Sequence, residues 1–248
     1  MGRAASVLRT PRGAAFAALL AVLFVYYAVA RHLPGLPLWG EVAFLGVVLI
    51  PAIFGLVWLA LPLWRARGVL PVGAAFAVLA VVCEIADLDI VADFSKLAAL
   101  TLFAFWFLEF FETVLWVALV AAIIPMVDIF SVFRGPTGHI IEERRSIFET
   151  IAFGFPVPGE VRPALLGPPD LLFFALFLAA AARWGLRVGW TWIALAASFG
   201  ATLALAVWLD IGGLPALPLL SLGFLIPNAD LLWRELQGAR RRRVAANE

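Results

Sequence analysis

The sequence is poor in cysteine, in histidine and in charge. Its single cysteine, Cys83, excludes an intrachain disulfide and a metal site built from cysteines. Its two histidines, His32 and His139, lie outside the centres of the apolar runs. They provide neither the His-Glu-x-x-His helix of a zinc protease nor the histidine partner of a membrane-embedded serine, so Ser198 is interpreted as a small packing residue. The sequence has no Gly-rich phosphate loop, no dinucleotide fingerprint and no basic-aromatic pattern that would indicate a nucleic-acid partner.

The scarcity of charge indicates where the protein resides. Charged residues make up 14% of the 248 residues, hydrophobic residues make up 64%, and the mean hydropathy is +1.02. Soluble domains carry about 25% charged and about 45–50% apolar residues. We therefore predict an integral, multi-pass protein of the cell membrane, whose constant partner is the lipid bilayer.

The apolar runs predict the number of membrane crossings. About 20 apolar residues cross a bilayer as a helix. The candidate spans are 14–31, 41–63, 69–86, 97–111, 113–133, 168–184, 189–209 and 213–233. The fourth is the shortest of them and carries Glu109 close to Glu112. The fold class that follows is all-α, a polytopic membrane helix bundle of about eight transmembrane helices, with seven to nine as the range.

One long polar connection divides the chain. Residues 1–133 form the N-terminal membrane helices, residues 134–167 the connecting loop, and residues 168–248 a C-terminal three-helix part. Arginines near the N-terminus place that end inside the cell, because positive residues favour the cytoplasmic side. With eight spans, the run Arg240 to Arg243 also lies inside, whereas the loop and the acidic group at 84–93 lie outside.

Two aspartates lie in or beside apolar helices. Asp128 occurs in AAIIPMVDIFSVF and Asp170 in LLGPPDLLFFALF. A carboxylate in hydrocarbon costs at least about 2.5 kcal/mol on insertion scales, so each is a candidate functional group. Their helices are consecutive and antiparallel, which places both acids toward the same side of the membrane. Two carboxyls that meet there share a proton and can activate water. Taken singly, an acid at the end of a span is more often a solvated cap than a catalyst.

Three short motifs resemble those of a known family. VD at 127–128, GPPD at 167–170 and PAL at 215–217 occur in the order seen in the GxGD intramembrane aspartyl proteases, the presenilin and signal peptide peptidase family. The segments DIFSVFRGPTGHIIEERRSIFE and GGLPALPLL also look like segments of presenilins. The resemblance covers about residues 113–233.

The resemblance implies a function and a set of site residues. Asp128 and Asp170 would be the catalytic pair, with no metal and no cofactor. The residues that would contact the substrate are Gly167, Pro215, Ala216 and Leu217. The substrates would be transmembrane proteins or signal-peptide remnants, held as an added strand by residues 215–217 together with the apolar stretch Ile147 to Phe155. No oligomeric state follows from the sequence.

Two departures from the family pattern keep alternatives open. Val127 stands where the family has tyrosine, and Pro169 stands where it has its second glycine. Proline fixes φ near −65°, so the backbone before Asp170 has less freedom than in the family. One alternative is therefore a catalytically silent presenilin-like protein that binds membrane proteins. Another is a proton-coupled transporter, since transporters also combine buried acids with broken helices.

Overall fold

Helices dominate the protein, and the all-α prediction is confirmed. The computed structural model describes residues 10–134, 150–211 and 214–245. Within them the α-helices are α2 (Pro11–Val29), α3 (Leu38–Phe44), α4 (Ile50–Ala60), α5 (Val69–Ile85), α6 (Asp89–Phe107), α7 (Val114–Arg134), α10 (Pro168–Arg183), α11 (Val188–Trp208) and α12 (Leu217–Ala245). A π-helical turn, Leu45–Leu49, joins α3 to α4 into one continuous rod.

Four helical stretches among the described residues are long and apolar enough to cross a membrane, by length and composition. These are Pro11–His32, Leu38–Arg65, Asp89–Phe110 and Val188–Trp208. Val69–Ile85 and Val114–Phe130 are shorter apolar helices. Each helical stretch coincides with one of the runs expected from the sequence, because an apolar run of this length can satisfy its backbone hydrogen bonds in lipid only as a helix.

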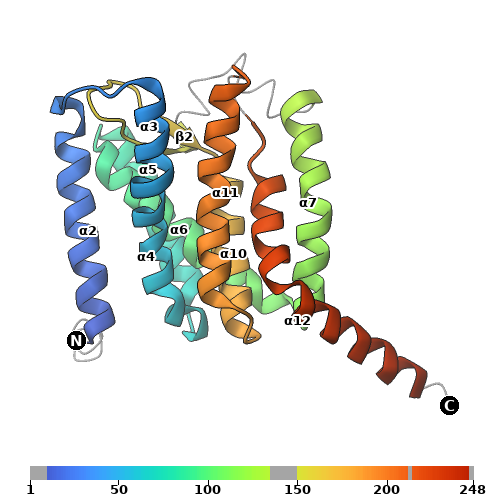
Figure 1. Ribbon diagram of the computed structural model, residues 1–248. Coiled ribbons are helices and arrows are strands. Elements are labelled where there is room, and N and C mark those ends of the chain that lie inside the picture. The colour runs from blue at the N-terminus through green and yellow to red at the C-terminus, as the bar shows by residue number, and fades with distance from the viewer. Residues whose placement is uncertain (1–9, 135–149, 212–213, 246–248) are drawn as a thin grey trace.

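The helices run alternately up and down through the bundle. In Figure 1, α2 rises from the end marked N, and α12 descends toward the same end of the bundle, where C is marked. The upper end of α7, the start of α10 and the two short strands all lie at the opposite end, which is called the upper end below. The end of α7 and the start of α10 thus lie at the opposite end of the bundle from the start of α2 and the end of α12.

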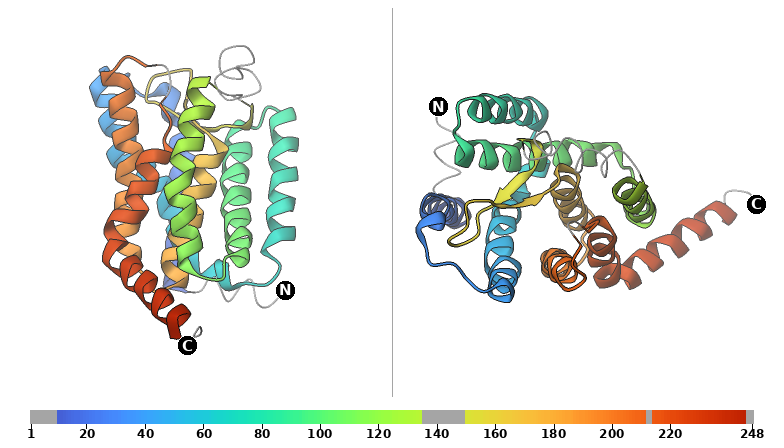
Figure 2. Two further views of the ribbon diagram at one scale, coloured as in Figure 1. Left: turned by 90° about the vertical axis from the view of Figure 1, so that its right-hand side faces the viewer. Right: turned by 90° about the horizontal axis from the view of Figure 1, so that it is seen from above.

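The helix α10 is the centre of the bundle. Its residues from Phe174 to Ala181 have no exposed surface. Phe174 stacks on Phe54 of α4 with ring centroids 3.8 Å apart, and Phe177 stacks on Phe224 of α12 at 4.9 Å. Helices on all sides therefore surround the helix that carries Asp170, as the view from above shows (Figure 2).

Helix α6 begins earlier than the sequence predicts. The expected span started at residue 97, whereas α6 starts at Asp89 and includes Asp93 and Lys96. The Lys96 ammonium lies 2.8 Å from the Glu84 carboxylate of α5 and 3.5 Å from that of Asp93. The predicted start was wrong because Lys96 pairs with both acids, and paired charges are tolerated where single ones are not.

A small antiparallel sheet precedes α10. Strand β1 (Phe153–Phe155) pairs with β2 (Ala164–Leu166), and Phe153 lies opposite Leu166. Because Leu166 is followed directly by Gly167 and the start of α10, the sheet is covalently attached to the segment that carries Asp170.

Candidate active site

The segment GPPD forms the start of α10. Gly167 is the N-cap residue, with φ −66° and ψ 147°, and Pro168 and Pro169 occupy the first two helical positions. Proline fits there because the first backbone N–H groups of a helix have no partner within the helix. Pro169 therefore stands at the second helical position without breaking the helix.

Asp170 is held at the third position of that helix. Its N–H donates to the Gly167 carbonyl at 3.1 Å. A Cβ atom placed on Gly167 would lie 3.2 Å from the Asp170 Oδ2 atom, closer than ordinary contact. Gly167 is thus the residue that leaves room for this carboxylate.

Asp128 lies on α7 beside the start of α12. Its Oδ2 atom accepts a hydrogen bond from the Leu217 N–H at 3.1 Å. Leu217 is the first residue of α12, and Pro215 and Ala216 before it are buried. A carboxylate is stabilised at this position because unpaired N–H groups and the helix dipole converge on it.

Asp128 and Asp170 lie on helices that contact one another. Helix α7 contacts both α10 and α12, and α10 contacts α12. Both aspartates are partly exposed. The structure therefore brings the segments that carry the expected site residues to one region: the two acids, Gly167 and the 215–217 segment. Two carboxyls that meet in such a region can share a proton and hold a water molecule between them.

Side chains of α2 and α6 hold the sheet from its other side. We call the set the β1 clamp, and it consists of Tyr26, Tyr27, Asp93 and Lys96. The Tyr26 hydroxyl donates to the Pro156 carbonyl at 2.7 Å, and Lys96 donates to the Ala152 carbonyl at 3.2 Å. Lys96 in turn is fixed by its ion pair with Glu84. The clamp anchors β1 to three helices.

The contacts of Gly154 determine which edge of the sheet is free. Its N–H donates to Asp93 Oδ1 at 3.3 Å, and its carbonyl accepts from the Tyr27 hydroxyl at 2.9 Å. Both groups therefore point away from β2. Along an antiparallel pair of strands, residue pairs that exchange backbone hydrogen bonds alternate with pairs that do not. Gly154 and Leu165 form a pair of the second kind, so the N–H and C=O of Leu165 point away from β1. That edge of β2, two residues before Gly167, pairs with no other described strand.

The clamp residues were not identified from the sequence. The sequence analysis assigned Asp93 to an acidic group outside the membrane and assigned no role to Tyr26, Tyr27 or Lys96. The available signal was the polar pair Asp93 and Lys96 at a spacing of three, which lies on one face of a helix.

The remaining polar candidates lie elsewhere. Glu109 and Glu112 are exposed next to the connection between α6 and α7, and Asp210 ends α11 with a φ of 53°. Asp230 pairs with Arg187 at 2.6 Å. The Ser198 hydroxyl lies between α11 and α12, within 2.8 Å of the Leu219 carbonyl, in agreement with a packing role.

Comparison with protein-family models, with curated proteins and with solved structures gives no match. A functional assignment for this chain therefore depends on the geometry of its own residues.

Proposed function

We propose that this protein is an eight-span intramembrane aspartyl protease of the presenilin and signal peptide peptidase type. It would hydrolyse peptide bonds in transmembrane segments or in signal-peptide remnants. The observation that carries the proposal is the placement of Asp128 and Asp170 on helices α7 and α10, which contact each other and α12, with Asp128 bound to the N–H of Leu217 at the buried start of α12. Such a pair is expensive in a membrane and has a direct chemical use.

The chemistry needs one carboxyl ionised and the other protonated. The ionised carboxylate accepts a proton from water, whose oxygen attacks the carbonyl carbon of the substrate. The protonated carboxyl donates its proton to the carbonyl oxygen, which gives a tetrahedral diol. On collapse of the diol, the carboxyl that took the proton from water gives it to the leaving amine, and one hydroxyl of the diol returns its proton to the other carboxylate, so the pair again holds a single proton. Because the pair acts as a unit, its two apparent pKa values belong to both residues together.

The free edge of β2 supports a mode of substrate binding. A helical substrate hides its amides, so it must become extended before cleavage. An extended segment added beside Leu165 would continue the sheet and carry its backbone past Asp170. This moves the expected binding strand from β1 to β2, because the outer edge of β1 is occupied by Asp93 and Tyr27. Residues 147–149 of the stretch first expected to bind lie outside the described residues.

The surface of α7 supports access from the lipid. The side chains next to Asp128 are apolar and exposed, with exposed fractions of 74% for Met126, 54% for Val127 and 63% for Phe130. A transmembrane helix can pack there without crossing water. Asp128, between these side chains and the start of α12, lies near this surface.

One observation favours a second candidate, a silent presenilin-like binding protein. The hydrogen bond from Leu217 to Asp128 is also what a purely structural helix cap would make. Val127 beside Asp128 and Pro169 beside Asp170 also depart from the family pattern. In that case the protein would bind transmembrane peptides and leave them intact.

Cleavage of a model transmembrane peptide by the purified, reconstituted protein tests the proposal, with products identified by mass spectrometry. We expect a bell-shaped dependence of cleavage on pH, and loss of cleavage in both Asp128→Asn and Asp170→Asn. The matched control is Asp210→Asn, because asparagine tolerates the same left-handed backbone and lies outside the pair. Cleavage that persists in Asp128→Asn would refute the proposal. Binding without cleavage by the wild type would favour the silent protein.

A further inference from the structure

The last helix changes direction at a proline. Pro227 lies inside α12, and the residues beyond it turn away from the bundle. Figures 1 and 2 show this segment projecting sideways past α7 at the lower end of the molecule. We refer to residues 228–245 as the C-terminal arm. A proline kinks a helix because it lacks an N–H and its ring clashes with the preceding turn.

The direction of the arm is held by Arg187. Its guanidinium donates to the Pro227 carbonyl at 2.7 Å and to both carboxylate oxygens of Asp230, at 2.6 and 2.8 Å. These hydrogen bonds hold the pKa of the Asp230 carboxyl below its usual value, so the pair stays ionised near neutral pH. The buried Asn228 accepts from the Arg187 N–H at 3.0 Å and donates to Thr191 at 2.8 Å. These contacts therefore hold the kink in the folded protein.

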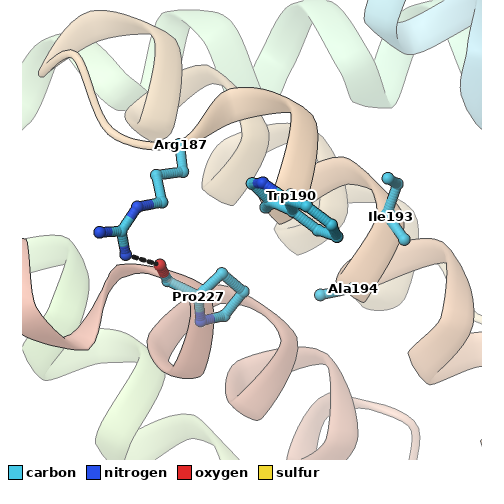
Figure 3. Close-up of a pocket in the computed structure, with 5 residues that line it drawn as sticks. All are labelled: Arg187, Trp190, Ile193, Ala194 and Pro227. Carbon is cyan, nitrogen blue, oxygen red and sulfur yellow. Dashed lines mark hydrogen bonds between the residues drawn. The ribbon is translucent and has the colours of Figure 1, made fainter.

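A pocket lies in the angle of the kink. Figure 3 shows Arg187 reaching the Pro227 carbonyl on one side of it, with Trp190, Ile193 and Ala194 of α11 on the other. Its volume is about 430 Å³. Trp190 is 66% exposed, so this side of α11 presents an aromatic ring next to the start of the arm. Tryptophan at such a level is typical of the membrane interface.

The arm is amphipathic in its first turns and basic in its last turns. Leu232 and Leu236, four residues apart, lie on one side of the helix, with Leu232 buried against the bundle and Leu236 half-buried, whereas Arg234 lies exposed on the opposite side. Trp233 is 55% exposed although it is large and apolar. Beyond these turns the arm carries consecutive exposed arginines, Arg240, Arg241 and Arg242. This combination is typical of a helix that lies in the interface of a membrane.

We propose that the C-terminal arm lies on the membrane surface and binds anionic lipid headgroups through Arg234, Arg240, Arg241 and Arg242. Charge complementarity supports anionic lipid headgroups as the ligands of the arm. The arm is at the same end of the bundle as the start of α2, which the positive residues place on the cytoplasmic side. The cytoplasmic leaflet is the one rich in anionic lipids, and clusters of four or more basic residues beside a membrane helix bind it. The inference rests on the membrane insertion proposed above and is independent of peptide hydrolysis.

Accessibility of spin labels on the arm tests the proposal. Single cysteines at Leu236, on the apolar side, and at Gln237 are introduced into the full chain with Cys83→Ala and placed in nanodiscs. The nanodiscs contain phosphatidylcholine alone or with phosphatidylglycerol. With the anionic lipid we expect the label at 236 to be accessible to oxygen and protected from a water-soluble nickel chelate, and the label at 237 to show the reverse. A third label at Ile193 reports whether the bundle itself is in the membrane.

Substitution of two arginines of the arm measures how strongly their charge contributes to membrane binding. Each basic residue near an anionic surface strengthens binding about fivefold, so Arg241→Gln with Arg242→Gln should lower the ratio of bound to free arm by about 25-fold. The control is Arg65→Gln with Arg67→Gln, which removes the same charge from exposed positions before α5 and should leave the ratio unchanged.

Three results would overturn the proposal. One is equal nickel accessibility at 236 and 237 in both membranes. Another is spin–spin broadening at 236 that disappears on dilution with unlabelled protein, because a second copy of the chain would then cover the arm. The third is nickel accessibility at Ile193, which would show that the bundle is not inserted. None of them depends on whether the protein cleaves peptides.

Discussion

The β1 clamp should contribute measurably to folding, and Lys96→Met is the perturbation that tests it. The Lys96 side chain is 12% exposed, and its partners Glu84 and Asp93 are 27% and 15% exposed. Methionine keeps the length of the side chain and removes its charge. Two neighbouring carboxylates then lose their common cation, and the Ala152 carbonyl loses its donor.

The expected cost follows from the burial of this cluster. Breaking a buried ion pair by removing one partner costs about 3–5 kcal/mol, because the remaining charge is left uncompensated. Since all three side chains retain some exposure, we expect about 3 kcal/mol, at the lower end of that range. For a chain of this length such a loss lowers Tm by about 6–12 °C.

Thermal unfolding of the purified protein in a fixed detergent measures the effect. A double-mutant cycle with Glu84→Gln separates the ion pair from loss of packing, because the second substitution removes one unpaired carboxylate and should recover part of the loss. The contrasting control is Arg187→Gln. It breaks an ion pair whose side chains are about half exposed, and exposed pairs add little to stability. A Lys96→Met protein as stable as wild type, or strictly additive effects in the cycle, would refute the clamp.

Three further expectations concern the site and the topology. Gly167→Ala should leave Tm nearly unchanged, because the φ of −66° at this position suits alanine. It should nevertheless slow cleavage about tenfold, because the added Cβ displaces the Asp170 carboxylate. Equal cleavage rates in the variant and the wild type would show that this contact is unimportant. Leu165→Pro removes the N–H of β2 that points to the free edge, and the fold should persist because proline is tolerated on a free edge. We expect a higher KM for cleavage. An unchanged KM would exclude strand addition at this edge. Single cysteines at Glu160 and Arg67 should react with an impermeant reagent from opposite faces of intact cells, and reaction from the same face would contradict the eight-span topology.

The helical segments and their order could be predicted from the sequence because the signal is local. An apolar run long enough to span a bilayer has no alternative to the helix, whatever it packs against. Asp128 and Asp170 could also be assigned to the same end, since one loop joins their two helices. The structure agrees on the helices, and it places α7 and α10 in contact with each other and with α12.

The start of α6 could not be predicted in the same way. Hydropathy counts Asp93 and Lys96 as unfavourable one residue at a time, whereas in the fold Lys96 lies between the carboxylates of Asp93 and Glu84 and pairs with both. The tyrosines of α2 were equally uninformative, because the carbonyl groups that they bind lie more than a hundred positions away in the sequence.

Only the tertiary structure decided which edge of the sheet is free and where the last helix leaves the bundle. The free edge follows from the direction in which Gly154 points, and that direction depends on side chains from α2 and α6. The sequence ended the last span near residue 233, but α12 continues to Ala245 and bends at Pro227, where Arg187 from another connection holds it. Composition and hydropathy record what each residue prefers, whereas these features depend on which residue it meets across the bundle.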